Sequence, residues 1–433
     1  MQNGNAGLAP ESTILASEAH AGYMECIRSG EWEFVGPNPA LTPLFHAITA
    51  GDGRRTALVA EGNGRDECYG YARCPVGLNG GKSYRLTVRL IAEGFDPVEH
   101  HVVHGIYGPS FSGGVFSFRR DGSQLVGEGR FPGPAEPMQA ELRLYFRYSA
   151  RGRVTWQEVS LEECEPIPPR PVTFACREGP APPNATLGYW EEWLDRAGER
   201  RPDIVLLPES FDGASPAAAC PPGGPSSALL AAKARQWNMH TCAAFYEIRG
   251  DLVYNVAPLF DRSGRLIGSY DKFLPYEDEL DQGVTPGREL QVFDTDVGCV
   301  GIMTCFDSWF PEFARALARM GAEMVLLPNA GYYSELMPAR AADNGFWIAA
   351  SSLYHPAGVW GTSGARAGEP AASASRESPS AIWSVQHDYV NGMLLVTVDL
   401  SKKYSPHWKG GPMLSAPAAR RARATNIGPI PDS

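Results

Sequence analysis

The stretch Cys299-Val-Gly-Ile-Met-Thr-Cys305-Phe-Asp-Ser-Trp-Phe-Pro-Glu312 places a cysteine where an apolar strand gives way to a helix. The residues before Cys305 are mostly apolar, and Pro311-Glu312 is typical of the first turn of a helix. Backbone N–H groups at a helix N-terminus favour negative charge, so we expect them to lower the pKa of the Cys305 thiol. The position predicts a nucleophile, although a lone cysteine at a strand end is more often a small core residue.

Two further polar residues follow apolar strands in the same half of the chain. Glu209 closes the run 204–208, and Lys272 follows 268–271. Strand ends of an open α/β sheet meet in one crevice, so we expect these two side chains to lie near Cys305. A carboxylate can take the thiol proton and an ammonium can stabilise an anion, so the three residues predict nucleophilic catalysis.

From residue 172 onward, short apolar segments alternate with amphipathic ones. This alternation predicts a sheet covered by helices, and therefore an α/β fold. The predicted strands are 172–176, 204–207, 241–246, 300–304 and 324–327, with a hairpin over 253–258 and 266–270 and helices over 187–197, over 229–237 and after 305, where Phe313, Leu317 and Met320 share a face.

The N-terminal part has a different pattern. Between residues 20 and 165, segments such as 84–92 and 142–148 alternate apolar with polar side chains, which predicts an all-β sandwich of jelly-roll type. The proline-rich stretch 166–171 then predicts a stiff linker, and 172–433 a catalytic domain with a C-terminal tail. We expect residues 1–19 to be flexible and 361–380 to form a long loop, either a lid or, more commonly, a surface excursion.

Length and composition limit the possible classes of protein. A chain of 433 residues favours two domains, and the net charge of −11 argues against nucleic acid as a partner. No window is apolar enough to predict a membrane-spanning helix, and the first residues lack the pattern of a secretory signal. Nine scattered cysteines, an odd number, favour reduced thiols and a cytoplasmic protein.

Residues 172 to about 410 resemble the carbon–nitrogen hydrolase (nitrilase) superfamily. The matching segments are Leu206-Leu207-Pro208-Glu209, Tyr254-Asn255, Tyr270-Asp271-Lys272, Pro286-Gly287 and Gly301-Ile302-Met303-Thr304-Cys305-Phe306-Asp307 with Phe310-Pro311-Glu312. The resemblance implies a four-layer αββα sandwich without metal or cofactor, assembled as a homodimer or larger homo-oligomer. It departs from many members at Asp271, where they carry Arg, and at Leu274, where they carry His.

The resemblance also implies roles for individual residues. Glu209 becomes the general base, Lys272 the oxyanion stabiliser and Cys305 the nucleophile, with the backbone N–H of Phe306 as a second oxyanion donor. A further glutamate near the lysine is expected to be Glu279. Glu277 is the competing choice, and Glu279 also fits a surface carboxylate in an acidic run.

The implied reaction is hydrolysis of an amide or N-carbamoyl amide through a thioester. Phe306-Asp307 favours amides, because nitrile hydrolases of this family usually carry Trp-Glu after the cysteine. Three alternatives stay open: an acyltransferase that uses the same thioester, a nitrilase, and a non-enzymatic scaffold whose N-terminal domain binds glycans or other ligands. The candidate substrate contacts are Tyr276, Trp309, Asn329 and Tyr332, for which packing in the core or at the rim is an equal alternative.

Overall fold

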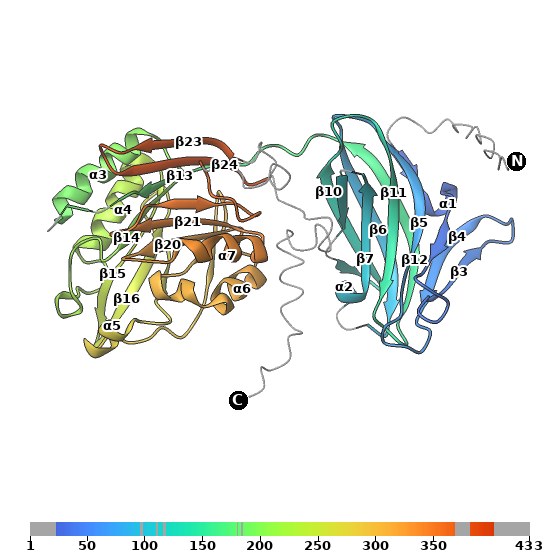
Figure 1. The fold of residues 1–433 in the computed structure, drawn as a ribbon, viewed down its shortest axis with the longest axis horizontal. Coiled ribbons are helices and arrows are strands. Elements are labelled where there is room, and N and C mark those ends of the chain that lie inside the picture. Colours follow the sequence, from blue (N-terminus) through green and yellow to red (C-terminus); the bar gives the residue numbers. More distant parts are fainter. Residues whose placement is uncertain are drawn as a thin grey trace, which may run out of the picture.

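The computed structural model describes residues 23–95, 98–109, 111–115, 118–179, 181–182, 185–368 and 382–401. Figure 1 shows two bodies, an all-β one built from β1 to β12 and a mixed one built from β13 to β24, joined by a single chain segment. The predictions for residues 1–19, for 369–380 of the long loop and for the C-terminal tail beyond 401 lie outside the described residues. No helix of the described ranges is long and apolar enough to cross a membrane.

The N-terminal body consists of two antiparallel sheets. One has the order β3-β4-β12-β6-β10-β9 with β1 on β12, and the other has the order β2-β5-β11-β7-β8. The elements are β1 (Tyr23–Glu25), α1 (Cys26–Ser29), β2 (Glu33–Val35), β3 (Leu44–Thr49), β4 (Arg55–Glu61), β5 (Tyr69–Leu78), β6 (Ser83–Glu93), α2 (Val98–His101), β7 (Val102–Gly108), β8 (Phe111–Val115), β9 (Arg119–Asp121), β10 (Gln124–Pro132), β11 (Met138–Arg147) and β12 (Arg153–Cys164).

The alternation of side chains determines which face of each sheet is buried. Leu86, Val88 and Leu90 of β6 and Leu142, Leu144 and Phe146 of β11 join one apolar cluster that also contains Trp156. The residues between them point outward, as the period of two of a β-strand requires. The predicted strands 84–92 and 142–148 correspond to β6 and β11.

The C-terminal body contains two more sheets, with the orders β17-β16-β15-β14-β13-β24-β23 and β18-β19-β20-β21-β22. β13 begins at Pro171, the last residue of the predicted linker. The elements are β13 (Pro171–Arg177), α3 (Leu187–Glu199), β14 (Ile204–Glu209), α4 (Pro225–Trp237), β15 (His240–Arg249), β16 (Leu252–Phe260), β17 (Leu266–Asp271), α5 (Glu277–Asp281), β18 (Val292–Thr295), β19 (Gly298–Ile302), α6 (Pro311–Met320), β20 (Met324–Asn329), α7 (Met337–Asn344), β21 (Trp347–Ser352), β22 (Gly358–Trp360), β23 (Ile382–Asp388) and β24 (Met393–Asp399), with short 3-10 helices at Pro216–Ala218, Cys305–Trp309 and Ser334–Leu336.

Three apolar clusters hold the C-terminal body together. The inner faces of the two sheets share a cluster in which Leu206 of β14 and Leu326 of β20 are fully buried. Trp190 of α3 and Leu230 of α4 pack on the other face of the larger sheet. Residues of α6 and α7 pack on the other face of the smaller sheet, so each sheet carries helices on its outer side only.

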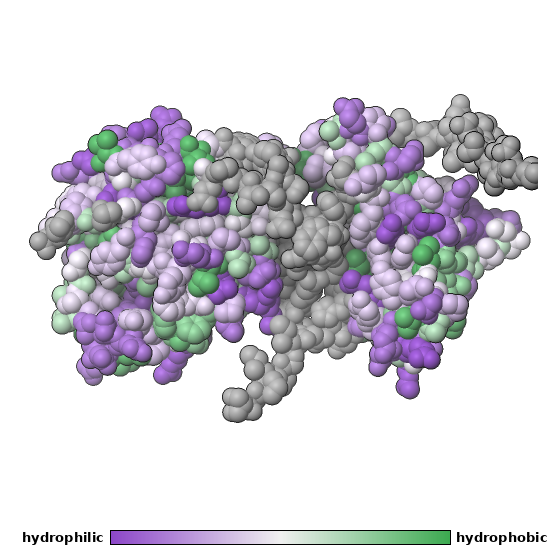
Figure 2. Space-filling model, in the orientation of Figure 1, coloured by the Kyte–Doolittle hydropathy of each residue, from purple (hydrophilic) through white to green (hydrophobic). Residues whose placement is uncertain are grey.

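Helix α6 illustrates how the sequence determines one of these contacts. It begins at Pro311 and ends before Gly321, whose φ of 100° lies in the left-handed region that favours glycine. Leu317 is fully buried, and Phe313 and Met320 are half-buried, so the predicted apolar face is the one that packs on the sheet. On the side of the molecule shown in Figure 2, hydrophilic residues cover most of the described surface and hydrophobic ones form small patches.

We expect Leu317→Ala to lower the free energy of unfolding of the C-terminal body by about 2–5 kcal/mol, because it removes buried methyl groups and leaves a cavity beneath α6. Urea unfolding monitored by tryptophan fluorescence measures this change. The matched control is Leu266→Ala, since Leu266 is 50% exposed at the start of β17 and should cost roughly 0.5 kcal/mol or less. Equal effects of the two substitutions would show that α6 does not contribute to the core in this way.

Candidate active site

The three predicted catalytic residues lie just beyond, or at, the ends of buried strands. Glu209 is the last residue of β14, and Lys272 follows β17, where its backbone N–H donates to Asn255 O at 2.8 Å. β19 ends at Ile302, and Cys305 opens a five-residue 3-10 helix. Cys305 has a φ of 46°, a conformation that non-glycine residues adopt uncommonly and that functional sites often contain.

A buried ammonium lies between two carboxylates at the centre of the site. Lys272 Nζ donates to Glu209 Oε1 at 2.8 Å and to Glu279 Oε2 at 2.5 Å. Lys272, Glu209 and Glu279 are 2%, 4% and 7% exposed. A buried ion of either sign is tolerated only with such partners, so the three side chains depend on one another.

Asn255 bridges the two carboxylates from the other side. Its Nδ2 donates to Glu209 Oε1 at 2.8 Å and to Glu279 Oε1 at 2.7 Å. The hydroxyl of Tyr246 donates a further hydrogen bond to Glu279 Oε1 at 3.3 Å. The sequence predicted no role for either residue, although Tyr254-Asn255 belongs to a segment that matches the family and could have indicated Asn255.

The geometry separates the two candidates for the second glutamate. Glu279 is buried, contacts Lys272, and accepts a hydrogen bond from the backbone N–H of Tyr276 at 2.7 Å. Glu277 is exposed at the start of α5. The structure therefore brings Glu279 into the site and leaves Glu277 at the surface.

Burial and the carboxylate of Glu209 both raise the pKa of Cys305, to about 12, against the influence of Lys272. The expectation that a helix N-terminus lowers this pKa is wrong, because desolvation of the half-buried thiol and the neighbouring Glu209 carboxylate raise it. The Cys305 thiol donates to Gly331 O at 3.1 Å and also interacts with the Glu209 carboxylate. The resting residue is thus a protonated thiol with a base beside it.

The base itself is held in its charged form. Burial alone would raise the pKa of Glu209, but attraction to Lys272 and hydrogen bonds from Lys272, Cys305 and Ala330 N lower it below the ordinary value. In the same way burial would lower the pKa of Lys272, and the surrounding acidic groups, Glu209 first, raise it instead. The site therefore holds a carboxylate and an ammonium next to a neutral thiol.

Asp307 holds the cysteine loop in place. It is fully buried and accepts hydrogen bonds from Thr304 N at 3.0 Å, Leu274 N at 3.0 Å and the Tyr270 hydroxyl at 2.8 Å. These bonds tie the loop that carries Cys305 to the segment on both sides of Lys272. Burial raises the pKa of Asp307 to about 6 although its hydrogen bonds act in the opposite direction.

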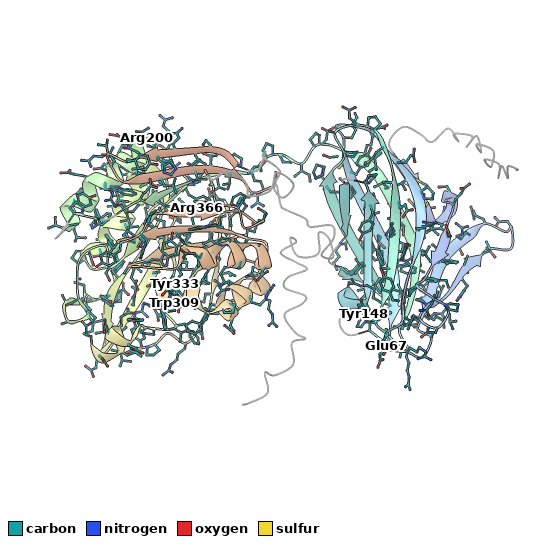
Figure 3. All side chains as sticks on the ribbon, in the orientation of Figure 1. Glu67, Tyr148, Arg200, Trp309, Tyr333 and Arg366 are labelled. Atoms are coloured by element: carbon teal, nitrogen blue, oxygen red, sulfur yellow. The ribbon has the colours of Figure 1, made fainter. Side chains whose placement is uncertain are left out.

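Aromatic side chains lie next to Cys305 in the sequence and pack against one another. The ring of Phe306 is 5.3 Å from Tyr276 and 5.1 Å from Trp309, and Trp309 is 4.6 Å from Tyr333. Tyr276, Trp309 and Tyr333 are 44%, 38% and 53% exposed. Figure 3 shows Trp309 and Tyr333 side by side. We call Tyr276, Phe306, Trp309 and Tyr333 the aromatic rim; no pattern in the sequence indicated a role for Tyr333.

The other two candidate substrate contacts are buried. Asn329 is fully buried and its amide donates to Leu327 O and Ser351 O, while Tyr332 is 6% exposed and its hydroxyl donates to Pro356 O. Of the four candidates, Tyr276 and Trp309 thus have exposed rings and Asn329 and Tyr332 are packed. In the part of the chain that the structure describes, no group of three or more His, Cys, Asp or Glu side chains could hold a metal ion.

The family model for carbon-nitrogen hydrolases matches residues 176–375, which contain the whole of this buried network. This segment belongs to the carbon–nitrogen hydrolase family of the nitrilase superfamily. The resemblance of this part of the chain to the superfamily is thereby confirmed.

Curated relatives match over parts of their length. The chain is 31% identical over 140 residues to the citrullinase of Francisella tularensis (28% of this chain, 48% of that protein) and 32% identical over 176 residues to a nitrilase of Pyrococcus abyssi (37% and 66%). It is 28% identical over 177 residues to the N-carbamoylputrescine amidase of Solanum lycopersicum (36% and 56%). The chain thus spans roughly half to two thirds of the length of these relatives.

Solved structures of the superfamily also match the chain. They include Nit3 of Saccharomyces cerevisiae, with 22% identity, a TM-score of 0.43 and coverage of 53% of this chain and 90% of that one. A Cys-to-Ser variant of the amidase from Nesterenkonia sp. AN1 matches with 24% identity, a TM-score of 0.42 and coverage of 53% and 91%.

We expect Asn255→Ala to lower kcat/KM by about one to two orders of magnitude or more, because it removes the hydrogen bonds of Asn255 to both Glu209 and Glu279. Glu209 would also lose a donor to its charged form, so its pKa rises and the acid limb of the kcat/KM profile moves to higher pH. A pH series with a hydrolysable amide measures both effects. Asn63→Ala, which removes an amide bonded to backbone carbonyls in the N-terminal body, should leave the limb in place. An unshifted limb in Asn255→Ala would contradict this role.

The raised pKa of Asp307 predicts how stability depends on pH. The folded chain holds this proton more tightly than the unfolded chain, whose Asp titrates near about 4. The stabilisation is therefore complete below about pH 4 and lost as the pH rises through about 6. The stability difference between the native chain and Asp307→Asn should fall over this interval and be constant above it.

Urea unfolding between pH 4 and 8 measures this difference. Asp278→Asn, at an exposed position of α5, is the matched control and should show no such slope. A difference that grows with rising pH would mean that the pKa of Asp307 is lowered in the folded chain.

Proposed function

We propose that this protein is an enzyme that hydrolyses a non-peptide C–N bond, in an amide or an N-carbamoyl amide, through a thioester on Cys305. The observation that carries the proposal is the buried contact of a neutral thiol with a charged carboxylate that is itself bonded to a lysine ammonium. The curated relatives include both amidases and nitrilases, so the proposal rests on this geometry and on Phe306-Asp307.

The first half of the reaction follows from the protonation states. The Cys305 thiol has a raised pKa, so its proton passes to Glu209 as the sulfur attacks the carbonyl carbon. The negative charge that develops on the carbonyl oxygen is stabilised by the Lys272 ammonium and the backbone N–H of Phe306. Glu209 then gives the proton to the leaving nitrogen, the C–N bond breaks, and ammonia or an amine departs.

The second half uses the same groups to hydrolyse the thioester. Glu209, again a carboxylate, takes a proton from water as the water oxygen attacks the thioester carbon. The same two donors stabilise the second oxyanion. The C–S bond then breaks, the sulfur regains its proton from Glu209, and the carboxylic acid leaves. No metal or cofactor enters this sequence.

Glu279 acts on Lys272 in this proposal. With Glu209 and Glu279 both against the ammonium, Lys272 stays charged when Glu209 becomes neutral during the reaction. Asn255, which donates to both carboxylates, keeps them apart and correctly oriented. Glu279 is therefore proposed as a positioning residue that preserves the oxyanion stabiliser.

The surroundings of the reaction are also part of the proposal. The domain would be a four-layer αββα sandwich that follows a jelly-roll-like domain, assembled as a homodimer or larger oligomer in the cytoplasm. The described cysteines are all free, which fits a reducing compartment. Tyr276 and Trp309, together with Tyr333, would contact the part of a small amide substrate that lies away from the scissile bond.

We expect Cys305→Ala to reduce turnover by about 10⁴-fold or more, because the nucleophile is lost. The chain should stay folded, because alanine is smaller than cysteine and fits the same space. An ammonia-release screen over amides, N-carbamoyl compounds and nitriles measures this, with circular dichroism as the check on folding. Cys220→Ala, which removes a half-buried thiol outside the site, is the matched control and should keep full activity. Full activity in Cys305→Ala would refute the proposal.

Mass spectrometry of the intact chain after a brief reaction should show one acyl group, located on the peptide that contains Cys305. The ratio of free acid to acyl-transfer product, in the presence of added amines, separates hydrolysis from acyl transfer. Predominance of transfer product would replace the hydrolase by an acyltransferase with the same nucleophile.

A further inference from the structure

The outward face of one sheet in the N-terminal body carries a group of tyrosines. In β5, β11 and β7, every second side chain points away from the core. Five of these outward positions, including one just beyond the end of β11, carry tyrosines: Tyr69, Tyr71, Tyr107, Tyr145 and Tyr148. We call these residues the tyrosine face. Tyr71 and Tyr145 are direct cross-strand partners, so the register of β5 and β11 brings the rings together.

The rings form a continuous row. The Tyr145 ring lies 5.0 Å from Tyr71, 5.9 Å from Tyr107 and 6.1 Å from Tyr69. Tyr148 continues the row at 6.3 Å from Tyr69, with its side chain 59% exposed. Figure 3 shows Tyr148 at one end of the N-terminal body. Its φ of 53° is rare for a bulky residue, so the fold holds this ring in an unusual conformation at the end of the row.

Arg143 lies in the middle of this face and is fixed there. Its guanidinium carbon is 4.9 Å from the ring centre of Tyr71 and 5.1 Å from that of Tyr107, both within the range of a cation–π contact. It donates twice to Glu141, at 2.9 and 2.6 Å, and once to the Tyr145 hydroxyl at 3.2 Å. The polar atoms of the face are therefore preorganised.

A glycine makes room for this arrangement. Gly105 is the cross-strand partner of Arg143 on β7, and a Cβ atom there would lie 2.8 Å from the ring of Tyr107. Without a side chain at this position, the Tyr107 ring can lie over the strand beside Arg143. A larger residue would force that ring away.

Four charged side chains at the centre of the face are paired with one another, while Arg147, further along β11, adds a positive charge beside the tyrosines. Arg73 pairs with Glu33 at 2.6 Å and with Glu141 at 3.1 Å, and Arg143 pairs with Glu141 at 2.6 Å. Paired charges of this kind leave little field to attract an ionic ligand. What the face offers is a row of half-exposed rings interspersed with fixed hydrogen-bonding groups.

The opposite sheet shows that an outward face in this body does not need tyrosines. There Arg85 pairs with Glu128 and Glu162, and Arg89 pairs with Asp121 and Glu158, at 3.0–3.4 Å. Such cross-strand ion pairs are a sufficient solvent-facing pattern for a sheet. The two outward faces of this body therefore differ, and the pairing of strands alone does not explain why one of them carries a row of tyrosines.

We propose that the tyrosine face binds a neutral carbohydrate chain, independently of the reaction at Cys305. The apolar C–H faces of sugar rings would lie on the tyrosine rings, and sugar hydroxyls would exchange hydrogen bonds with Arg143, Glu141 and the tyrosine hydroxyls. The paired charges of Arg73, Arg143, Glu33 and Glu141 favour a neutral ligand over an anionic one at the centre of the face. The open row of rings favours several sugar units over a single enclosed sugar.

Affinity electrophoresis of the full chain tests this proposal. Native gels would contain barley β-glucan, xylan, galactomannan or amylopectin as neutral probes, and alginate as an anionic one. We expect at least one neutral polysaccharide to slow the chain, with little effect of salt. Tyr71→Ala and Tyr145→Ala should each weaken that binding about tenfold, the effect of losing one aromatic contact.

Two further variants keep the test decisive. Tyr148→Ala changes an exposed ring at the end of the row, where folding is least affected, and should also weaken binding. Tyr389→Ala removes a tyrosine that is 76% exposed in the C-terminal body, and should bind like the native chain. Amide hydrolysis should be unchanged in all four variants, because the face is separate from the catalytic network.

Four results would overturn the proposal. The first is that none of the four neutral polysaccharides slows the chain, and the second is that only alginate slows it and salt abolishes that effect. The third is that the three tyrosine-face variants bind as well as the native chain. The fourth is that Tyr71→Ala converts an oligomer to a monomer in sedimentation. The last result would make the face an interface between copies of the chain. Loss of hydrolysis in Cys305→Ala leaves the binding result unaffected, so the two proposals fail separately.

Discussion

The contact of one buried ammonium with two buried carboxylates is the constraint on which the C-terminal body depends. Lys272 can be charged at 2% exposure only because Glu209 and Glu279 lie against it, and the Glu209 carboxylate is kept charged by Lys272 and its other hydrogen-bond donors. Removing any member would leave a buried charge without its partner. The strand ends that carry these residues are therefore fixed relative to one another by electrostatics as well as by the apolar clusters on either side of each sheet.

The Cys305 thiol, the proposed nucleophile, lies beside this ion cluster without taking part in its charge balance. Cys305 is neutral at rest, so the ion cluster is complete before substrate arrives. In the proposed reaction, charge develops on the sulfur and the carbonyl oxygen only when Glu209 accepts the proton, next to the Lys272 ammonium. Asp307 fixes the loop that carries Cys305 relative to the segment that carries Lys272, because it accepts hydrogen bonds from Leu274 N in one and Thr304 N in the other. The hydrogen bonds of Asp307 that hold the cysteine loop in the fold would therefore also position Cys305 for the proposed reaction.

Much of the geometry of this candidate site could be predicted from the sequence, because each proposed catalytic residue follows a recognisable apolar strand. Glu209, Lys272 and Cys305 were found in this way, and family spacing selected Glu279 over Glu277. The pKa of the thiol was predicted in the wrong direction, because the sequence shows the helix start but not the burial. Asn255, Tyr246 and Tyr333 had no predicted function, since a bridging amide or a packed ring is defined by three-dimensional neighbours. The tyrosine face depends on the register of β5, β11 and β7, which alternation alone does not determine.

The left-handed backbone at Cys305 has a consequence for how this domain can change over time. A non-glycine residue with a φ of 46° stores strain of order 1–2 kcal/mol, which glycine would relieve. Folding by itself would therefore favour glycine at position 305, and under the proposed function selection for turnover would retain the thiol. A lineage that no longer needs the reaction can gain stability by giving up its nucleophile. Descendants of this domain that have lost the activity should then have a higher free energy of unfolding than their active ancestors, and a glycine at position 305 would identify them.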